Sequence, residues 1–262
     1  MTGELSIVRD GPVVRLTLAR PDKRNALSRS LVTALRDAFT SIHEGEGVRV
    51  VVLAGDGPAF CAGADIGEFV DAAQDGQAVA DARGIADLLA AMSSCPAPII
   101  APVHGAVYGG GVGLVCAADI AIAAEGTRFA LSEARLGLVP AVIAPWVFAA
   151  LGRRQARAVM LQAGPFDTDR ALRCGLVHQC VPEHELESVV EETIGHLLQA
   201  APGALAAIKR LPSMIDGFDP AQHRAATTAL LAERLASDEG QEGLRAFLEK
   251  RPAGWTQAEA PR

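Results

Sequence analysis

The chain has 262 residues, of which 50% are hydrophobic and 21% charged, a globular composition without the bias of a disordered segment. Its formal net charge of −7 argues against a surface built for nucleic-acid phosphates. Five scattered cysteines without a C-x-x-C pair predict reduced thiols, so we expect a cytoplasmic protein with no signal peptide, transit peptide or membrane helix.

The first elements expected along the chain are a β-hairpin and a helix. Two alternating apolar runs flank Asp10-Gly11 and predict a hairpin over residues 5–20. The next segment has the period of an amphipathic helix, with Ser28 or Ser30 as its N-cap and Gly45 near its end.

Two buried strands and two helices are predicted next. The continuous apolar runs at 48–55 and 97–103 are typical of strands buried on both faces. Between them, Asp65 is a plausible N-cap for a helix that begins at about Ile66. A second helix is expected over residues 79–92.

The remaining chain becomes progressively helical. A short helix at 112–118, a strand at 119–124 and an extended piece at 127–131 are followed from Val142 by an almost wholly helical pattern. The one exception is a short strand expected at 176–181.

The fold class predicted from this order is α/β. A strand–strand–helix rhythm recurs at 5–44, 48–92 and 97–118 and indicates a coiled stack of similar units. Pro202-Gly203 marks a break, so we divide the chain into a core of residues 1–200 and a C-terminal helical region of residues 201–262.

The segment HGAVYGGGVGL, residues 104–114, places a glycine cluster between a strand and a helix. Gly110 would lie at a helix N-terminus, where free N–H groups and the dipole favour a phosphate or a developing oxyanion. A tight turn without a ligand is the equally open alternative. The spacing fails the G-x-G-x-x-G dinucleotide pattern, and no P-loop is present.

A second cluster of small residues, AFCAGADIGEF at 59–69, again follows a buried strand. Such side chains allow a ligand to approach the main chain, although an ordinary capped turn explains them as well. A third feature is Glu133, which stands among apolar residues after an extended segment. An apolar setting raises a carboxyl pKa toward neutrality, unless Glu133 is solvated or paired with Arg128 or Arg135.

Taken together and in order, PDKRNALS, FCAGADI, VHGAVYGGGVGL and RFALSEARLGLVP resemble the crotonase family of enoyl-CoA hydratases and isomerases. The resemblance covers essentially the whole chain. It implies a crotonase-like spiral of strand–strand–helix units with a C-terminal helical region, and an assembly of three or six subunits. It also implies an acyl-CoA thioester substrate whose oxyanion is held by the backbone N–H groups of Ala64 and Gly110.

The resemblance further implies how coenzyme A is held, with the CoA belonging to the substrate and no cofactor bound permanently. The C-terminal region would cover the active site and support oligomerisation, with one pair reaching the CoA of a neighbouring subunit. The residues that match CoA contacts are Lys23, Arg24, Ala26, Leu27, Ala62, Asp65, Ile66, Phe247 and Lys250.

One departure from the family pattern bears on the reaction. Many hydratases of this family carry two glutamates, of which Glu133 matches the later, while Gly113 occupies the earlier position. This variant resembles methylglutaconyl-CoA hydratase-like members. We therefore expect a hydratase with a single glutamate, with 3,2-enoyl-CoA isomerase and non-catalytic acyl-CoA binding as alternatives. No metal-ligand spacing and no G-x-S-x-G is present, and the net charge disfavours RNA binding.

Overall fold

The computed structural model describes residues 3–215 and 219–256. Its strands are β1 (Leu5–Asp10), β2 (Val13–Leu18), β3 (Val50–Gly55), β4 (Ile99–Val103), β5 (Ala106–Tyr108), β6 (Ile120–Ala124), β7 (Arg128–Ala130) and β8 (Gln179–Val181). Its longer helices are α1 (Arg29–Thr40), α2 (Ile66–Gln74), α3 (Ala78–Ser94), α4 (Gly110–Ala117), α5 (Ala144–Gln162), α6 (Thr168–Arg173), α7 (Leu186–Gln199), α8 (Pro202–Met214), α9 (Pro220–Ala236) and α10 (Asp238–Leu248).

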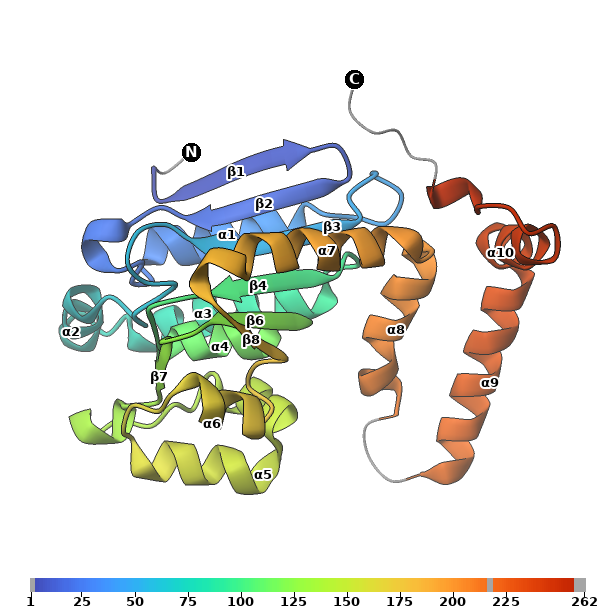
Figure 1. The fold of residues 1–262 in the computed structure, drawn as a ribbon. Helices are drawn as coiled ribbons and strands as arrows, with labels where there is room; N and C mark the ends of the chain where they lie inside the picture. Colours follow the sequence, from blue (N-terminus) through green and yellow to red (C-terminus); the bar gives the residue numbers. More distant parts are fainter. Residues whose placement is uncertain (1–2, 216–218, 257–262) are drawn as a thin grey trace.

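A six-stranded sheet in the order β1-β2-β3-β4-β6-β8 forms the centre of the molecule (Figure 1). The hairpin predicted at Asp10-Gly11 is confirmed: β1 pairs antiparallel to β2, and Gly11 has a φ of +53°. Every later pair in this sheet is parallel, so each strand is laid beside the preceding one after a crossover. This is the expected spiral of repeated units.

Both faces of the sheet are buried, which explains the continuous apolar strands. On one face Leu53 and Val103 join a large core with α1, α3, α4 and α5. On the other face Val52 and Ile122 pack against Ile194 of α7. Because successive residues of a strand point to opposite faces, a run such as VVVL supplies both cores at once.

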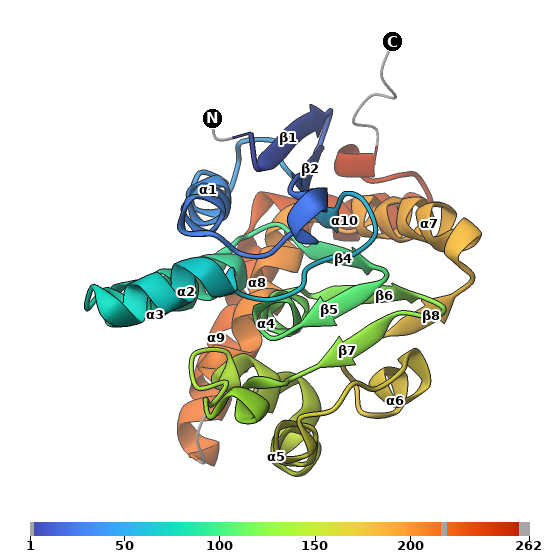
Figure 2. The ribbon, with the colours of Figure 1, turned by 90° about the vertical axis from the view of Figure 1, so that its left-hand side faces the viewer.

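A second, two-stranded sheet pairs β5 with β7 in parallel, with β7 drawn below β5 in Figure 2. In the unit expected at 48–92, the second strand is reduced to two isolated bridges, Cys61 with Val107 and Ala64 with Leu27. The regular strand–strand–helix repeat is therefore wrong for that unit. Its place is taken by an irregular segment, because the φ of +100° at Gly63 interrupts extended backbone there.

Helix α1 shows the main boundary error of the sequence prediction. Ser28, rather than Ser30, is the N-cap, since its hydroxyl accepts a hydrogen bond from the N–H of Leu31. The helix ends at Thr40, five residues before Gly45. The helices expected from Ile66 and over 79–92, and the strand expected at 176–181, are confirmed within a few residues.

Helices α8, α9 and α10 extend away from the sheet and are called the arm below (Figure 1). Helix α9 packs on α8 and α10, and no described side chain of α9 is fully buried. The arm begins at Pro202, where the boundary of the C-terminal region was predicted. In the described part of the chain, no helix combines the length and the hydrophobicity needed to cross a bilayer.

Candidate active site

Ala64 lies on a short extended segment that pairs with Leu27 on one side and with strand β5 on the other. On one side, Leu27 receives a hydrogen bond from the N–H of Asp65 (3.0 Å) and donates one to the carbonyl of Gly63 (2.7 Å). On the other side, the N–H of Tyr108 donates to Cys61 (2.9 Å). Since both neighbours of Ala64 face Leu27, its own N–H faces the Tyr108 side and has no hydrogen-bond partner among the described residues.

Gly110 is the first residue of helix α4, so its N–H has no partner within the helix. The preceding Gly109 has a φ of +47° and donates its N–H to Ala130 (2.9 Å), which turns the chain abruptly from β5 into the helix. A β-carbon added at Gly111 would lie 2.5 Å from the carbonyl oxygen of Cys61. The glycine cluster therefore lets the two backbone segments lie unusually close.

The two amides belong to facing backbone segments. A β-carbon built at Gly63 would lie 3.7 Å from the nitrogen of Gly110, and one built at Gly110 would lie 4.0 Å from the nitrogen of Ala64. The structure thus brings the backbone around Ala64 close to the helix N-terminus at Gly110, where N–H donors and the helix dipole favour a negative charge.

Glu133 lies at the start of the 3-10 turn η2 (Glu133–Leu136), just after β7. Pairing of β7 with β5 brings it to the glycine cluster: its Oε1 is 3.2 Å from the position of a β-carbon on Gly109. Its Oε2 is buried with no hydrogen-bond partner among the described residues. Burial raises the pKa of Glu133, partly offset by its own backbone N–H. The alternative pairing with Arg128 or Arg135 is wrong, because no ion pair to Glu133 exists in the described chain.

Gly113 is packed too tightly to be replaced by a larger residue without rearrangement. A β-carbon there would lie 2.6 Å from Cγ2 of Ile143 and 3.6 Å from Cδ1 of Leu89. Ile143 is 4% exposed and directly precedes α5. The position of a second glutamate is thus filled by aliphatic side chains that cannot transfer protons.

The predicted CoA-side residues fall into two groups. Residues 24–27 run along the segment that carries Ala62 and Asp65, and the N–H of Ala62 donates to Arg24 (2.9 Å). Lys23 and Ile66 are exposed nearby in sequence, at η1 (Pro21–Lys23) and at the start of α2. In contrast, Phe247 lies on α10 and Lys250 two residues after its end. Helix α10 is far from α2 in Figure 1, so a single chain does not bring this pair beside the first group.

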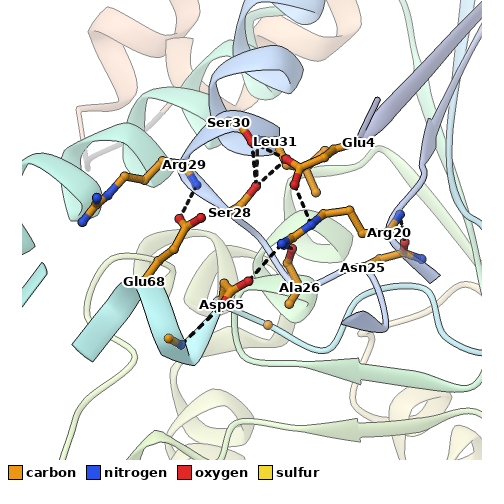
Figure 3. A network of polar contacts seen from close by, with 12 residues as sticks. Glu4, Arg20, Asn25, Ala26, Ser28, Arg29, Ser30, Leu31, Asp65 and Glu68 are labelled. Carbon is orange, nitrogen blue, oxygen red and sulfur yellow. Dashed lines mark hydrogen bonds and ion pairs between the residues drawn. The ribbon is translucent and has the colours of Figure 1, made fainter. Parts of the chain in front are cut away.

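Sequence reasoning missed two residues at this site, Ile143 and Arg20. The carboxylate of Asp65 caps α2 through Gly67 (3.2 Å) and also binds the guanidinium of Arg20 (3.0 Å; Figure 3). The only sequence signal for Arg20 was a charged residue directly after an apolar strand.

A pocket of about 280 Å³ opens beside Ala64 and Leu27, between α1, α2 and α3. In the described chain, no three metal-ligating side chains gather.

The chain is similar to known proteins over almost its whole length. A family model described as enoyl-CoA hydratase/isomerase matches residues 9–258. Enoyl-CoA hydratase ACTT6 of Alternaria alternata is 32% identical over 257 residues, covering 97% of this chain and 84% of that protein. Pseudomonas aeruginosa AtuE is similar in structure with a TM-score of 0.93 and 39% identity, covering 97% of this chain and all of its own. An enoyl-CoA hydratase from Shewanella pealeana ATCC 700345 gives a TM-score of 0.89 at 37% identity, covering 96% of each chain.

Proposed function

The chain belongs to the enoyl-CoA hydratase/isomerase (crotonase) family, and from this premise we propose that it adds water across the 2,3 double bond of an enoyl-CoA thioester. One observation carries the proposal: the N–H groups of Ala64 and Gly110, which have no partner among the described residues, belong to the same glycine cluster that Oε1 of the half-buried Glu133 approaches, while its Oε2 is buried and unpaired. We propose that this arrangement holds a thioester enolate next to a proton-transferring group.

The two amides supply the electrostatic part of the mechanism. When an oxygen nucleophile attacks C3, the electron pair of the double bond moves through C2 onto the thioester oxygen. The N–H groups of Ala64 and Gly110 donate to that oxygen, and the N-terminus of α4 adds a positive dipole end. Each such donor is worth roughly 3–4 kcal/mol of barrier, because it is aimed before the charge develops.

Glu133 supplies the proton transfer. Its carboxylate takes one proton from water while the remaining hydroxide bonds to C3. The same carboxyl group then delivers that proton to C2, which collapses the enolate to the saturated thioester and restores the carboxylate. Water is thereby divided into a hydroxyl on C3 and a hydrogen on C2, and one buried carboxyl of raised pKa suffices for both transfers.

The aliphatic filling around Gly113 favours isomerisation as the second candidate. With Ile143 and Leu89 against Gly113, Glu133 has no second acid beside it at this position. A lone carboxylate can also move a proton between C2 and C4, which converts a 3-enoyl into a 2-enoyl thioester. Assaying 2-enoyl-CoA hydration and 3-enoyl-CoA isomerisation with the same preparation separates the two reactions.

The decisive variant is Glu133→Gln, which keeps the shape of the side chain and removes its basicity. We expect kcat to fall by about 10³-fold or more with little change in acyl-CoA affinity, since general acid–base catalysis supplies factors of this order. Steady-state hydration and isomerisation rates, with calorimetric binding of a saturated acyl-CoA, provide the measurement. Wild-type rates in the variant would remove Glu133 from the mechanism. Binding without turnover in the wild type would support the non-catalytic alternative.

The proposal extends to coenzyme A and to the assembly. We assign the CoA part of the substrate to the edge formed by residues 23–27, Ala62, Asp65 and Ile66, with no permanently bound cofactor. We also propose a homotrimer or a dimer of trimers, in which Phe247 and Lys250 of one arm reach the CoA of a neighbouring subunit. We further propose a cytoplasmic location; the five cysteines, all within the described chain, are free thiols there.

A further inference from the structure

Arg20, which follows strand β2, is one of the least exposed arginines of the described chain, with 13% of its side chain accessible. Its guanidinium binds three acceptors from three segments: Glu4 Oε1 at 2.7 Å, Asp65 Oδ2 at 3.0 Å, and the carbonyl oxygen of Ala26. Figure 3 shows these groups converging on the guanidinium from different parts of the chain. The planar guanidinium has five N–H donors and can bind three acceptors in fixed directions, whereas a lysine ammonium cannot.

Two acceptors of Arg20 lie next to Ala64 and next to its bridge partner Leu27. Asp65 directly follows Ala64, and Ala26 directly precedes Leu27, the residue that pairs with Ala64. The Leu27–Gly63 and Leu27–Asp65 hydrogen bonds fix which way the Ala64 peptide faces. The guanidinium therefore joins the two segments whose mutual register directs the Ala64 N–H.

The same network also anchors the starts of two helices. Glu4 accepts hydrogen bonds from Ser28 (2.6 Å) and from Ser30, and Ser28 caps α1. Asp65 caps α2 with its other carboxylate oxygen. Burial alone would raise the pKa of both acids. The hydrogen bonds from Ser28 and Ser30 to Glu4 and from Arg20 to Asp65, together with the Arg20 charge, lower both instead.

We propose that Arg20 is a positioning residue for the oxyanion hole: by tying Asp65 to Ala26 across the Leu27–Ala64 bridge, it holds the Ala64 N–H on the thioester oxygen. The proposal rests on the proposed function. Asp65 stays part of the CoA edge, and its carboxylate gains a second role in holding the hole. A misplacement of about 1 Å in such a donor costs on the order of 100-fold in rate.

Three variants test this proposal. Arg20→Gln removes all three side-chain contacts but leaves the backbone bond from Arg20 to Asn25 in place. Asp65→Asn keeps an N-cap acceptor for α2 and removes the charge that Arg20 binds. Arg15→Gln is the control, because Arg15 lies on β2 and its ion pair is with Glu191 of α7.

The measurement combines kinetics with the absorption spectrum of a bound conjugated thioester, 2,4-hexadienoyl-CoA. Polarisation of its carbonyl by the oxyanion hole shifts the absorption to longer wavelength, a signal that a general loss of stability does not move. We expect Arg20→Gln to lower kcat about 10- to 100-fold with KM changed less than about threefold, and to reduce the red shift. Asp65→Asn should also lower kcat and reduce the red shift, but to a smaller extent. Arg15→Gln should change neither kcat nor the red shift.

Folded Arg20→Gln and Asp65→Asn proteins with wild-type kcat and an unchanged red shift would overturn the proposal, as would a rise in KM alone. If Arg20→Gln does not fold, Asp65→Asn decides. A wild-type enzyme without turnover on any enoyl-CoA would defeat the proposed function. The red shift of the bound thioester would then still report on Arg20 independently.

Discussion

Glu133 stands where burial opposes its charge, which only its own backbone N–H partly offsets, and its Oε2 has no hydrogen-bond partner among the described residues. A buried carboxylate with an unpaired oxygen destabilises a fold unless it is protonated. Such a residue is unfavourable for stability and useful for chemistry, since it exchanges protons at a pH nearer neutrality. The geometry and the raised pKa thus point to the same role.

The raised pKa leads to a prediction about the pH dependence of catalysis. Protonated Glu133 cannot accept a proton from water, so kcat/KM for hydration should fall on the acid side with an apparent pKa above the ordinary glutamate value of about 4.3. A pH–rate profile with a substrate that does not titrate in this range checks it. An acid limb at or below the ordinary value would contradict the burial argument.

The ionised form of Glu133 that catalysis requires should lower the stability of the fold. Because the folded-state pKa is raised, the folded chain holds this proton more tightly than the unfolded chain, and the associated stability is present at low pH and lost as pH rises through the folded pKa. Glu133→Gln should therefore melt a few degrees higher than wild type at neutral pH and equally at pH near 4. Melting curves at several pH values measure the difference.

Residues of the site differ in how far the sequence could predict them. Gly110 begins a helix, Ala64 lies two residues before one, and Glu133 follows a strand by three residues, so local pattern and family resemblance place them. Arg20 joins residues at positions 4, 26 and 65, and Ile143 meets Gly113 thirty positions earlier. Contacts across such separations depend on how strands stack, which no local periodicity encodes.

At the scale of elements, helix α4 explains why the glycine cluster is needed. Its eight residues begin at Gly110, directly after a residue with a φ of +47°, and lie against the backbone of Cys61. Sequence pattern predicted this helix and its N-terminal glycine. It failed at the end of α1 and at the second strand of the middle unit, because Gly63 and tertiary contacts override propensity there.

This geometry offers a matched pair of variants at Gly110. Proline is tolerated at the first helical position and removes the N–H, whereas alanine keeps it. Both add a β-carbon that would lie 2.8 Å from Cδ1 of Leu27, the movable end of a side chain. We expect Gly110→Pro to lower kcat by a further 10²- to 10³-fold relative to Gly110→Ala, the usual effect of losing one oxyanion donor. Equal kcat values in the two folded proteins would exclude Gly110 as a donor.

At the scale of the whole molecule, the arm leaves much apolar surface uncovered. Leu231, Leu244, Phe247 and Leu248 are 62%, 50%, 81% and 79% exposed. Large exposed apolar side chains clustered on one region of a chain are typical of protein–protein interfaces, and homo-oligomers cover them by symmetry. The sequence predicted helices here and an oligomeric role, but the arm's separation from the sheet depends on packing that only the structure displays.

The proposed trimer or hexamer can be tested on α10. Light scattering of the wild type should give a mass near three or six times 27.2 kDa. The double variant Phe247→Asp with Leu248→Asp places two charges on the most exposed apolar pair of the arm and should shift the mass toward the monomer. Val8→Asp, at a 54% exposed position of the N-terminal hairpin, is the control and should leave the mass unchanged.

If arms complete neighbouring CoA sites, the α10 variant should also raise KM for acyl-CoA severalfold in proportion to the dissociated fraction. A monomeric variant with wild-type KM would separate assembly from CoA binding, because Phe247 would then act only at the interface.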